Sequence, residues 1–304
     1  WSSDHRRHHR HVDDNLKDPY SAGRGFWYSH IGWMLREYQR EIYNDYSNVR
    51  DLQNNPVVVF QHKHYLALTL ATNIGIPLLL GLVHGDLLGM LLLAGVLRMV
   101  MTHHTTFFIN SLAHIWGSQP FTDRNTARDN GILAFFTFGE GYHNFHHLFE
   151  NDYRNGIRWW QFDPTKWLIR SASWCGLARD LRSCPDERIE QARLEMQLKR
   201  AQAKLRKRED RELWQALLQE EYDKLSQQLQ LYYASRKSLL EQRKRKALAR
   251  YDKLKLQLEY RNLHDGFVAS KRNWSRLLTR KKKNKGHDTA QRDRQPAVFL
   301  WAQT

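Results

Sequence analysis

The sequence predicts an all-α integral membrane protein with one transmembrane hairpin, a histidine-rich helical cap and a long helical C-terminal extension. Three observations support this: two adjacent apolar segments of membrane-spanning length, histidine clusters spaced for one helix face on both sides of them, and a final stretch rich in helix formers. The net charge of +16 would suit nucleic acid or an anionic membrane surface. Because the apolar segments favour a membrane, and no Walker loop, dinucleotide motif or nucleic-acid-binding signature occurs, we expect no nucleic-acid partner.

The chain opens with the histidine-rich stretch WSSDHRRHHRHVDD. In a helix, His5, His8 and His9 stand at i, i+3 and i+4, so their rings share one face and can converge on one point. Imidazole is a ligand for zinc, copper, iron and nickel. On these residues alone, a solvated basic turn is an equally good interpretation.

The segment GRGFWYSHIGWML, Gly23 to Leu35, mixes aromatic and apolar residues with few charges. Such a composition is typical of a segment at a membrane interface, and a core strand of a soluble protein is the alternative.

Two apolar segments follow, Tyr65 to His84 and Leu87 to Asn110. Each is near the roughly 20 residues that a helix needs to cross a bilayer, and the turn around Gly85 and Asp86 predicts a hairpin. Two buried helices of a soluble protein are a weaker alternative, because the segments have no polar face. Arg98 is the one Lys or Arg inside the hairpin, so the positive-inside rule places both flanks in the cytoplasm, and Arg98 is expected to snorkel toward that side.

A second triplet in EGYHNFHHLF, His143, His146 and His147, repeats the first spacing. The hairpin would bring both triplets together, with His114 and Asn110 of NSLAHIWG at the end of its second helix. A lone histidine is more often packed or hydrogen-bonded, and only the flanking triplets favour His114 as a ligand. Seven histidines exceed one tetrahedral zinc site, so we predict two metal ions, with a redox pair favoured. A zinc hydrolase using Glu140 as acid or base stays an alternative.

The remainder of the chain separates into the end of the first domain and a helical extension. YRNGIRWWQFDPTKW again has an interfacial composition, and Cys175 and Cys184 fit a reducing compartment, with packing as their role. We place the domains at 1–184 and 185–304, because the composition changes at Pro185. Asp186 to His264 contains no Pro and no Gly, and Glu, Gln, Lys, Arg, Leu and Ala dominate it, as in a long helix or helical hairpin.

Within this extension, steps of four and three form a short heptad seam. It consists of Leu218, Tyr222, Leu225, Leu229, Tyr232, Arg236 and Leu239. The seam predicts either a helix folding back on its neighbour or a homo-oligomer through the C-terminal helices. The final RKKKNKGHDTAQRDRQ is a basic tail suited to anionic headgroups.

Four motifs follow one another over roughly residues 1 to 184: DHRRHH, DPYSAGRGFWYSHIGWML, NSLAHIWG and GEGYHNFHHLFENDYRNGIRWWQFDPTKW. In this order they resemble the membrane fatty-acid desaturases, most closely the bacterial and animal Δ9 acyl-CoA type. The resemblance implies a di-iron (Fe2+) enzyme of unsaturated fatty acid biosynthesis. Such an enzyme uses O2 and two electrons to introduce a cis double bond into a saturated acyl chain. A related di-iron hydroxylase or alkane monooxygenase, and a non-catalytic membrane-anchored helical scaffold, are the alternatives.

The resemblance also implies the site residues. The iron ligands would be His5, His8, His9, His114, His143, His146 and His147, with Asn110 acting through a water. Thr106 and Phe107 would contact the acyl chain. His11, His30, His103 and His104 match no ligand position; we expect a structural hydrogen-bonding role for His30 and interface positions for His103 and His104.

Two departures from the family pattern concern the carrier and the first histidine box. Arg36, Glu37 and Tyr38 stand where the animal enzymes have a basic pair near the CoA phosphates, so a phospholipid acyl chain is an alternative to acyl-CoA. The first box, HxxxxH, and its hairpin are missing. We therefore expect the chain to be the C-terminal portion of a longer desaturase that binds substoichiometric iron by itself. We also expect a separate electron donor of the ferredoxin, cytochrome b5 or reductase type.

Overall fold

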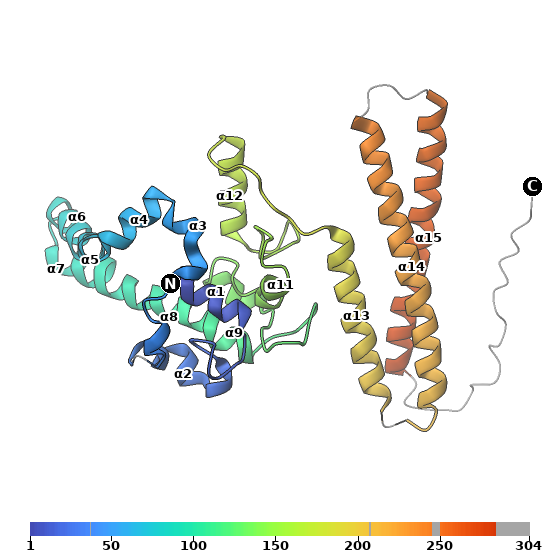
Figure 1. Cartoon of the computed structure of the whole chain (residues 1–304), viewed down its shortest axis with the longest axis horizontal. Helices are drawn as coiled ribbons and strands as arrows, with labels where there is room; N and C mark the ends of the chain where they lie inside the picture. Colours follow the sequence, from blue (N-terminus) through green and yellow to red (C-terminus); the bar gives the residue numbers. More distant parts are fainter. Residues whose placement is uncertain (37, 207, 245–249, 284–304) are drawn as a thin grey trace, which may run out of the picture. The chain divides into compact units, whose positions relative to one another are not determined.

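The computed structural model describes residues 1–36, 38–206, 208–244 and 250–283, and in these residues helices are joined by loops (Figure 1). Two isolated bridges, Ser118 with Asp129 and Asp129 with Tyr142, are the β-structure of the described part. The chain forms two compact units, Trp1–Met196 and Gln197–Thr304. The predicted all-α class is confirmed.

The first unit consists of short helices around a long helical hairpin. Its α-helices are α1 (Ser2–Arg10), α2 (Phe26–His30), α3 (Arg50–Gln53), α4 (Pro56–Lys63), α5 (Tyr65–Leu70), α6 (Ile76–His84), α7 (Leu87–Met90), α8 (Arg98–Asn110), α9 (Leu112–Ile115), α10 (Gly131–Phe136), α11 (His143–Leu148) and α12 (Pro164–Trp174). Four 3₁₀ turns, η1 (Ala22–Arg24), η2 (Gly32–Met34), η3 (Arg40–Ile42) and η4 (Ser47–Val49), and two π-helical segments, η5 (Ala71–Gly75) and η6 (Leu91–Leu97), complete it.

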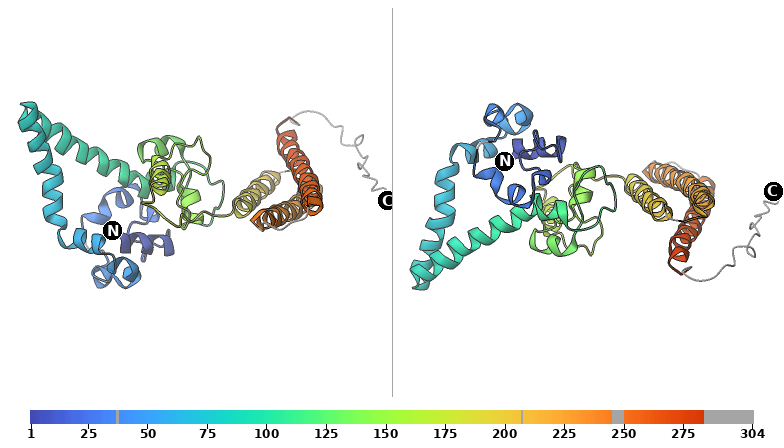
Figure 2. Two further views of the ribbon diagram at one scale, coloured as in Figure 1. Left: turned by 90° about the horizontal axis from the view of Figure 1, so that it is seen from above. Right: turned by 90° about the horizontal axis from the view of Figure 1, so that it is seen from below.

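The helical hairpin has two continuous arms, α5 to α6 and α7 to α8, which meet at one turn and spread toward the cap (Figure 2). Gly85 ends α6 with a left-handed backbone (φ 85°), and the Asp86 carboxylate then accepts the Gly89 N–H at 2.7 Å to cap α7. Both arms, Tyr65–His84 and Leu87–Ile115, are long and apolar enough to cross a membrane. The predicted hairpin is therefore present, and its second arm continues past Asn110.

A polar contact joins the two arms where their π-helical segments face each other. Arg98 donates from Nη2 to Asn73 Oδ1 at 2.6 Å and from Nε to the Ala94 carbonyl at 2.7 Å. Gly95 permits this approach, since a Cβ there would lie 2.9 Å from the Asn73 carbonyl oxygen. The guanidinium is thus held between the two arms, and snorkelling of Arg98 toward the cap stays a prediction.

The second arm breaks at Ser111, between α8 and α9. Ser111 has φ −109° and ψ −70°, and its hydroxyl donates to the Phe107 carbonyl at 2.9 Å. His30 of α2 supports the break, because its Nδ1 lies 3.0 Å from Ser111 Oγ and its Nε2 lies 3.0 Å from His104 Nδ1. The structural hydrogen-bonding role expected for His30 agrees with these contacts. The break redirects the chain so that α9 enters the cap.

Buried polar side chains fix the loop before α11. Asn144 is fully buried and donates from Nδ2 to the carbonyls of Thr122 and Ala127 at 2.8 and 2.9 Å. Asp129 accepts the N–H groups of Asn144 and Phe145 at 2.8 and 3.1 Å, at the start of α11. These bonds satisfy N–H groups that the first turn of a helix leaves free.

The predicted interfacial segments expose large aromatic side chains. Trp27 is 73% exposed and Trp159 is 86% exposed, and neither segment contains a strand among the described residues. The core-strand alternative for Gly23 to Leu35 is therefore wrong.

The first unit extends into α13 (Asp186–Leu205). Ile189, at 3% exposure, packs with Phe121 and Phe145 in one buried cluster, which Cys184 and Ala192 flank. The division between the compact units falls after Met196, and the domain boundary at Pro185 stays a prediction. The compact unit reaches beyond Pro185 because the start of α13 covers Phe121 and Phe145.

The second unit contains an antiparallel pair, α14 (Arg211–Lys244) and α15 (Arg250–Lys283) (Figure 1). Leu218, Leu225 and Leu229 of the heptad seam are buried, and Tyr232 stacks on Phe267 of α15 with ring centroids 5.3 Å apart. The seam is thus covered by the neighbouring helix, as the fold-back interpretation expected. Most of the basic tail, from residue 284 onward, lies outside the described residues, as does Glu37.

Candidate metal centre

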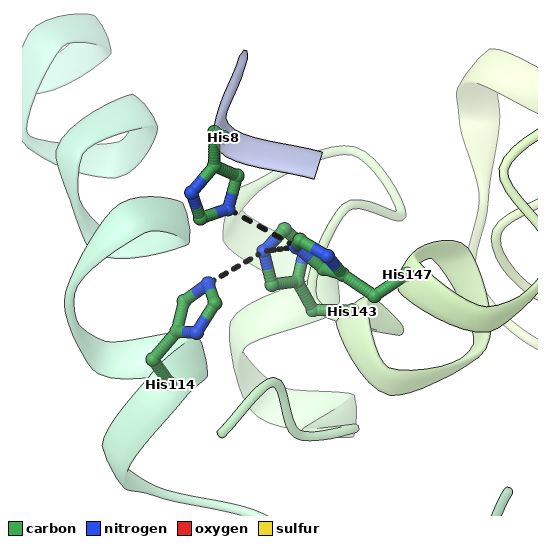
Figure 3. Close-up of side chains that lie close together, drawn as sticks. All are labelled: His8, His114, His143 and His147. Atoms are coloured by element: carbon green, nitrogen blue, oxygen red, sulfur yellow. Dashed lines mark hydrogen bonds between the residues drawn. The ribbon is translucent and has the colours of Figure 1, made fainter. Parts of the chain in front are cut away.

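Seven histidines predicted as ligands converge in two groups. His8, His114, His143 and His147 are buried, and their ligand nitrogens all lie within 4.8 Å of one another (Figure 3). His5, His9 and His146 form the second group under the same limit and are less buried. Each group has the ligand type and number of a transition-metal site.

Three elements supply these side chains. Helix α1 presents His5, His8 and His9, α11 presents His143, His146 and His147, and α9 adds His114. The i, i+3, i+4 spacing places each triplet on one helix face, as predicted. The break at Ser111 brings His114 to the same point.

The contacts within each group run through Nε2 atoms. In the first group His8 lies 3.2 Å from His147, His147 lies 3.0 Å from His143, and His143 lies 3.1 Å from His114. In the second group His9 Nε2 lies 3.2 Å from His5 Nε2 and 3.1 Å from His146 Nε2.

Five of these rings, those of His5, His8, His143, His146 and His147, are neutral at physiological pH. Burial, followed by the charges of neighbouring histidines, lowers the pKa of His5 to about 3 and that of His146 to about 3. Burial likewise lowers the pKa of His8 to about 3 and those of His143 and His147 well below 6.5. A neutral ring has one lone pair available for a metal.

The nitrogen arrangement fits metal ions better than a hydrogen-bond network. A ring nitrogen carries either one proton or one lone pair, so three successive Nε2 contacts cannot all be hydrogen bonds. In addition, the buried Nδ1 atoms of His143 and His147 have no hydrogen-bond partner among the described residues. A cation between the Nε2 atoms would satisfy the converging lone pairs.

Polar groups behind the rings orient several of them. His8 Nδ1 lies 2.9 and 3.0 Å from the two oxygens of the fully buried Asp18, whose carboxylate can only accept. His8 therefore carries its proton on Nδ1 and directs the Nε2 lone pair into the first group. His5 Nδ1 lies 3.1 Å from the Tyr20 hydroxyl, and His9 Nδ1 lies 3.4 Å from Glu150 Oε1.

The other predicted site residues lie on α8, outside the two histidine groups. Asn110 ends α8, four residues before His114. Thr106 is exposed and donates to the Thr102 carbonyl at 2.9 Å, while Phe107 packs edge-on against His30 with centroids 5.5 Å apart. Contact of Thr106 and Phe107 with an acyl chain stays a prediction.

Sequence reasoning missed the residues behind the ligands. They are Asp13, Asp18, Tyr20, Thr126 and Glu150. Asp18 and Tyr20 belong to the motif that begins DPY, so the resemblance to the family could have indicated them. Thr126 lies in a loop without a recognisable pattern, and only the fold brings it to His114.

The alternative acid, Glu140, is half-buried in the turn between α10 and α11. It accepts a hydrogen bond from Asn155 Nδ2 at 2.8 Å, and burial raises the pKa of its carboxyl group. This environment leaves the zinc-hydrolase alternative open.

A separate cavity of about 740 Å³ lies on the outer side of α1. Basic side chains of Arg6, Arg10, Lys17 and Arg40 contribute to its lining. Arg6 is already paired with Asp51 at 2.7 Å. Glu41 and Asp45 also line it, but the basic side chains outnumber them, so the lining suits an anionic group.

Comparison with known proteins adds independent evidence. Residues 1–173 match the sequence model of the fatty acid desaturase family. A probable acyl-CoA desaturase of Schizosaccharomyces pombe is 50% identical over 62% of this chain and 40% of its own length, and acyl-CoA desaturase 1 of Saccharomyces cerevisiae is 47% identical over 67% of this chain and 40% of its own length. The sn-2 palmitoyl-lipid 9-desaturase of a Nostoc species is 36% identical over 62% of this chain and 64% of its own length.

The chain spans about 40% of the length of the two yeast relatives. The matched region contains both histidine triplets, the hairpin and His114. The chain therefore belongs to the fatty acid desaturase family.

Proposed function

We propose that this chain supplies the iron-binding region of an O2-dependent acyl desaturase that introduces a cis double bond, at the Δ9 position, into a saturated acyl chain. The observation that carries the proposal is the convergence of seven histidines into two groups at the cap end of two membrane-length helices. The names of the relatives, which include acyl-CoA and acyl-lipid desaturases, support the same reaction class.

The proposed cofactor is a pair of Fe2+ ions. His8, His114, His143 and His147 would hold one ion, and His5, His9 and His146 the other, with Asn110 acting through a water. When bound, the ions would supply the activation of O2 that removal of hydrogen from an acyl chain requires. The chain's own contribution is to keep the rings neutral, to hold the His8 proton at Nδ1 through Asp18, and to exclude water by burial.

The proposed topology has both ends of the hairpin in the cytoplasm. Within the two spans Arg98 is the one Lys or Arg, and it makes its polar contacts with Asn73 and Ala94 inside the hairpin. All other cations lie outside the spans, so the positive-inside rule places the cap, the histidines and the C-terminal helices on the cytoplasmic side of a multi-pass membrane protein.

The proposed substrate is the acyl chain of an acyl-CoA or a phospholipid. Both carriers contain phosphate, for which the basic cavity at Arg10 and Lys17 is suited, and relatives of both kinds exist. Thr106 and Phe107 on α8 would contact the acyl chain near the metal centre.

The electrons would come from a separate protein of the ferredoxin, cytochrome b5 or reductase type. A homo-oligomer through the C-terminal helices would need surfaces other than the heptad seam, because Leu225 and Leu229 are already buried within the pair of helices.

The experiment is expression of the full-length protein in a desaturase-deficient host, followed by gas chromatography and mass spectrometry of the lipids. We expect unsaturated acyl chains and iron in the purified protein. Hydroxylated chains would instead identify the related hydroxylase. Zinc or no metal, without new lipid, would favour the scaffold.

A further inference from the structure

Three side chains from distant segments form a hydrogen-bonded row that ends on a candidate ligand. Asp13 follows α1, Thr126 lies in the loop before α10, and His114 lies on α9. Thr126 Oγ1 lies 2.6 Å from Asp13 Oδ1 and 2.9 Å from His114 Nδ1. Asp13 Oδ1 itself is 4.0 Å from His114 Nδ1, too far for a direct hydrogen bond.

The direction of each bond in this row follows from the groups involved. An aspartate carboxylate only accepts, so the single hydroxyl proton of Thr126 goes to Asp13. The Thr126 oxygen then has only lone pairs for His114, and His114 must donate from Nδ1. A neutral ring has one N–H, so the lone pair of His114 is on Nε2, which faces His143 Nε2 at 3.1 Å.

The backbone shows that Asp13 is held in place for this contact. Asp13 has φ 67°, one of three positive values among non-glycine residues of the described part. The left-handed conformation is unfavourable for an ordinary L-residue, although aspartate tolerates it better than most. Surrounding bonds maintain it, because Asp13 Oδ2 accepts the Thr126 N–H at 2.7 Å and the Asp13 N–H donates to Asp18 at 3.2 Å.

We propose that Asp13 is a positioning residue for the metal ligand His114 and acts through the hydroxyl group of Thr126. The inference rests on the proposed metal centre. Asp13 fixes the tautomer of His114 through two successive hydrogen bonds, whereas Asp18 contacts His8 directly. His8 and His114, two ligands of one group, are thus oriented by different contacts, one direct and one through a hydroxyl group. Asp13 also links the loop after α1 to the loop before α10.

Two substitutions disrupt the hydrogen bonds from Asp13 through Thr126 to His114 while preserving the shape of the side chain. Thr126→Val keeps the volume but has no hydroxyl. Asp13→Asn tolerates the same backbone conformation, yet its amide can donate to Thr126, which frees the hydroxyl proton to point at His114. Thr126→Ser restores the hydroxyl. Asp14→Asn is the matched control, since Asp14 binds the N–H groups of Leu16 and Lys17 at 2.9 and 3.2 Å in its own turn.

The first measurement is anaerobic titration of the purified, metal-free full-length protein with Fe(II), with melting of the metal-free protein as the fold control. We expect Thr126→Val and Asp13→Asn to weaken Fe(II) binding about 10–100-fold at unchanged Tm, as loss of a group behind a metal ligand does. Thr126→Ser and Asp14→Asn should bind like the parent. Parent-like affinity in Thr126→Val and Asp13→Asn would overturn the proposal.

The second measurement does not depend on iron. Nitrogen-15 NMR of labelled histidine, assigned by a His114→Gln spectrum, reports which ring nitrogen of His114 carries the proton in the metal-free protein. We expect Nδ1–H in the parent and in Thr126→Ser, and a shift toward Nε2–H in Asp13→Asn. An Nε2–H ring in the parent would overturn the inference, whereas absence of Fe(II) binding in the parent would overturn the proposed function alone.

Discussion

At the scale of single residues, His114 and His146 test the metal centre because they belong to different groups and come from different elements. Replacing either by Ala removes one nitrogen ligand and should abolish unsaturated product in the full-length protein and lower its iron content, while membrane insertion persists. His103→Gln is the control, since His103 is exposed on α8 and stacks on Phe107 with centroids 5.6 Å apart. Loss of activity in His103→Gln with retention in His114→Ala would show that the ligands are misassigned.

The buried histidines also predict how acid affects the metal-free protein. Burial lowers the folded-state pKa of His146 to about 3 from 6.5, so between these values the unfolded chain binds more protons than the folded one. Stability therefore falls as the pH falls through this range, by about 1.4 kcal/mol per pH unit for each such group. The Tm of the metal-free protein in detergent should decrease from pH 7 to pH 4, and less steeply in His146→Gln. Equal slopes for parent and variant would contradict this origin.

The two triplets were predictable at this scale, because i, i+3, i+4 spacing is a local property of the chain. The residues that orient the rings were not. Thr126 is 113 residues from Asp13 and 12 residues from His114. Neither separation matches the spacing of residues on one helix face, so the sequence pattern does not reveal these contacts. Only the folded loops bring these side chains together.

At the scale of elements, the hairpin was predictable and the break in its second arm was not. Gly85 and Asp86 have the roles that their residue types favour, a left-handed helix end and a helix cap. Ser111 has no such signature. At this break the Ser111 hydroxyl contacts His30, which lies 81 residues earlier in the chain.

The helical pair of the second unit permits a matched test of its packing. Leu229 is fully buried, whereas Leu231 on the same helix is 49% exposed. Leu229→Ala should destabilise α14 and α15 by about 2–5 kcal/mol, and Leu231→Ala should change stability by no more than about 0.5 kcal/mol. Hydrogen exchange of peptides from both helices measures this difference locally. Equal protection in the two variants would show that the seam contributes no packing energy.

At the scale of the whole molecule, the boundary between the units depends on contacts that the sequence did not reveal. The amino-acid composition changes at Pro185, but the extent of a compact unit depends on which side chains pack against one another. Ile189 packs with Phe121 and Phe145, and the Arg193 guanidinium lies 5.2 Å from the centre of the Phe121 ring. Phe145 stands between His143 and His146 on α11, so the start of α13 packs against a helix that carries candidate ligands.

Two truncations of the full-length protein test where the iron-binding domain ends: at Pro185, where the composition changes, or after Met196, where the packing changes. A chain ending at Met196 retains Ile189, and we expect it to keep its iron content and Tm. A chain ending at Cys184 exposes Phe121 and Phe145 and loses the burial of one isoleucine, about 1.5–3 kcal/mol. Because Phe145 lies between two candidate ligands, His143 and His146, iron content should fall together with Tm. Equal iron and Tm in the two truncations would place the boundary at Pro185, and loss of iron in the chain ending at Met196 would make α14 and α15 part of the iron-binding region.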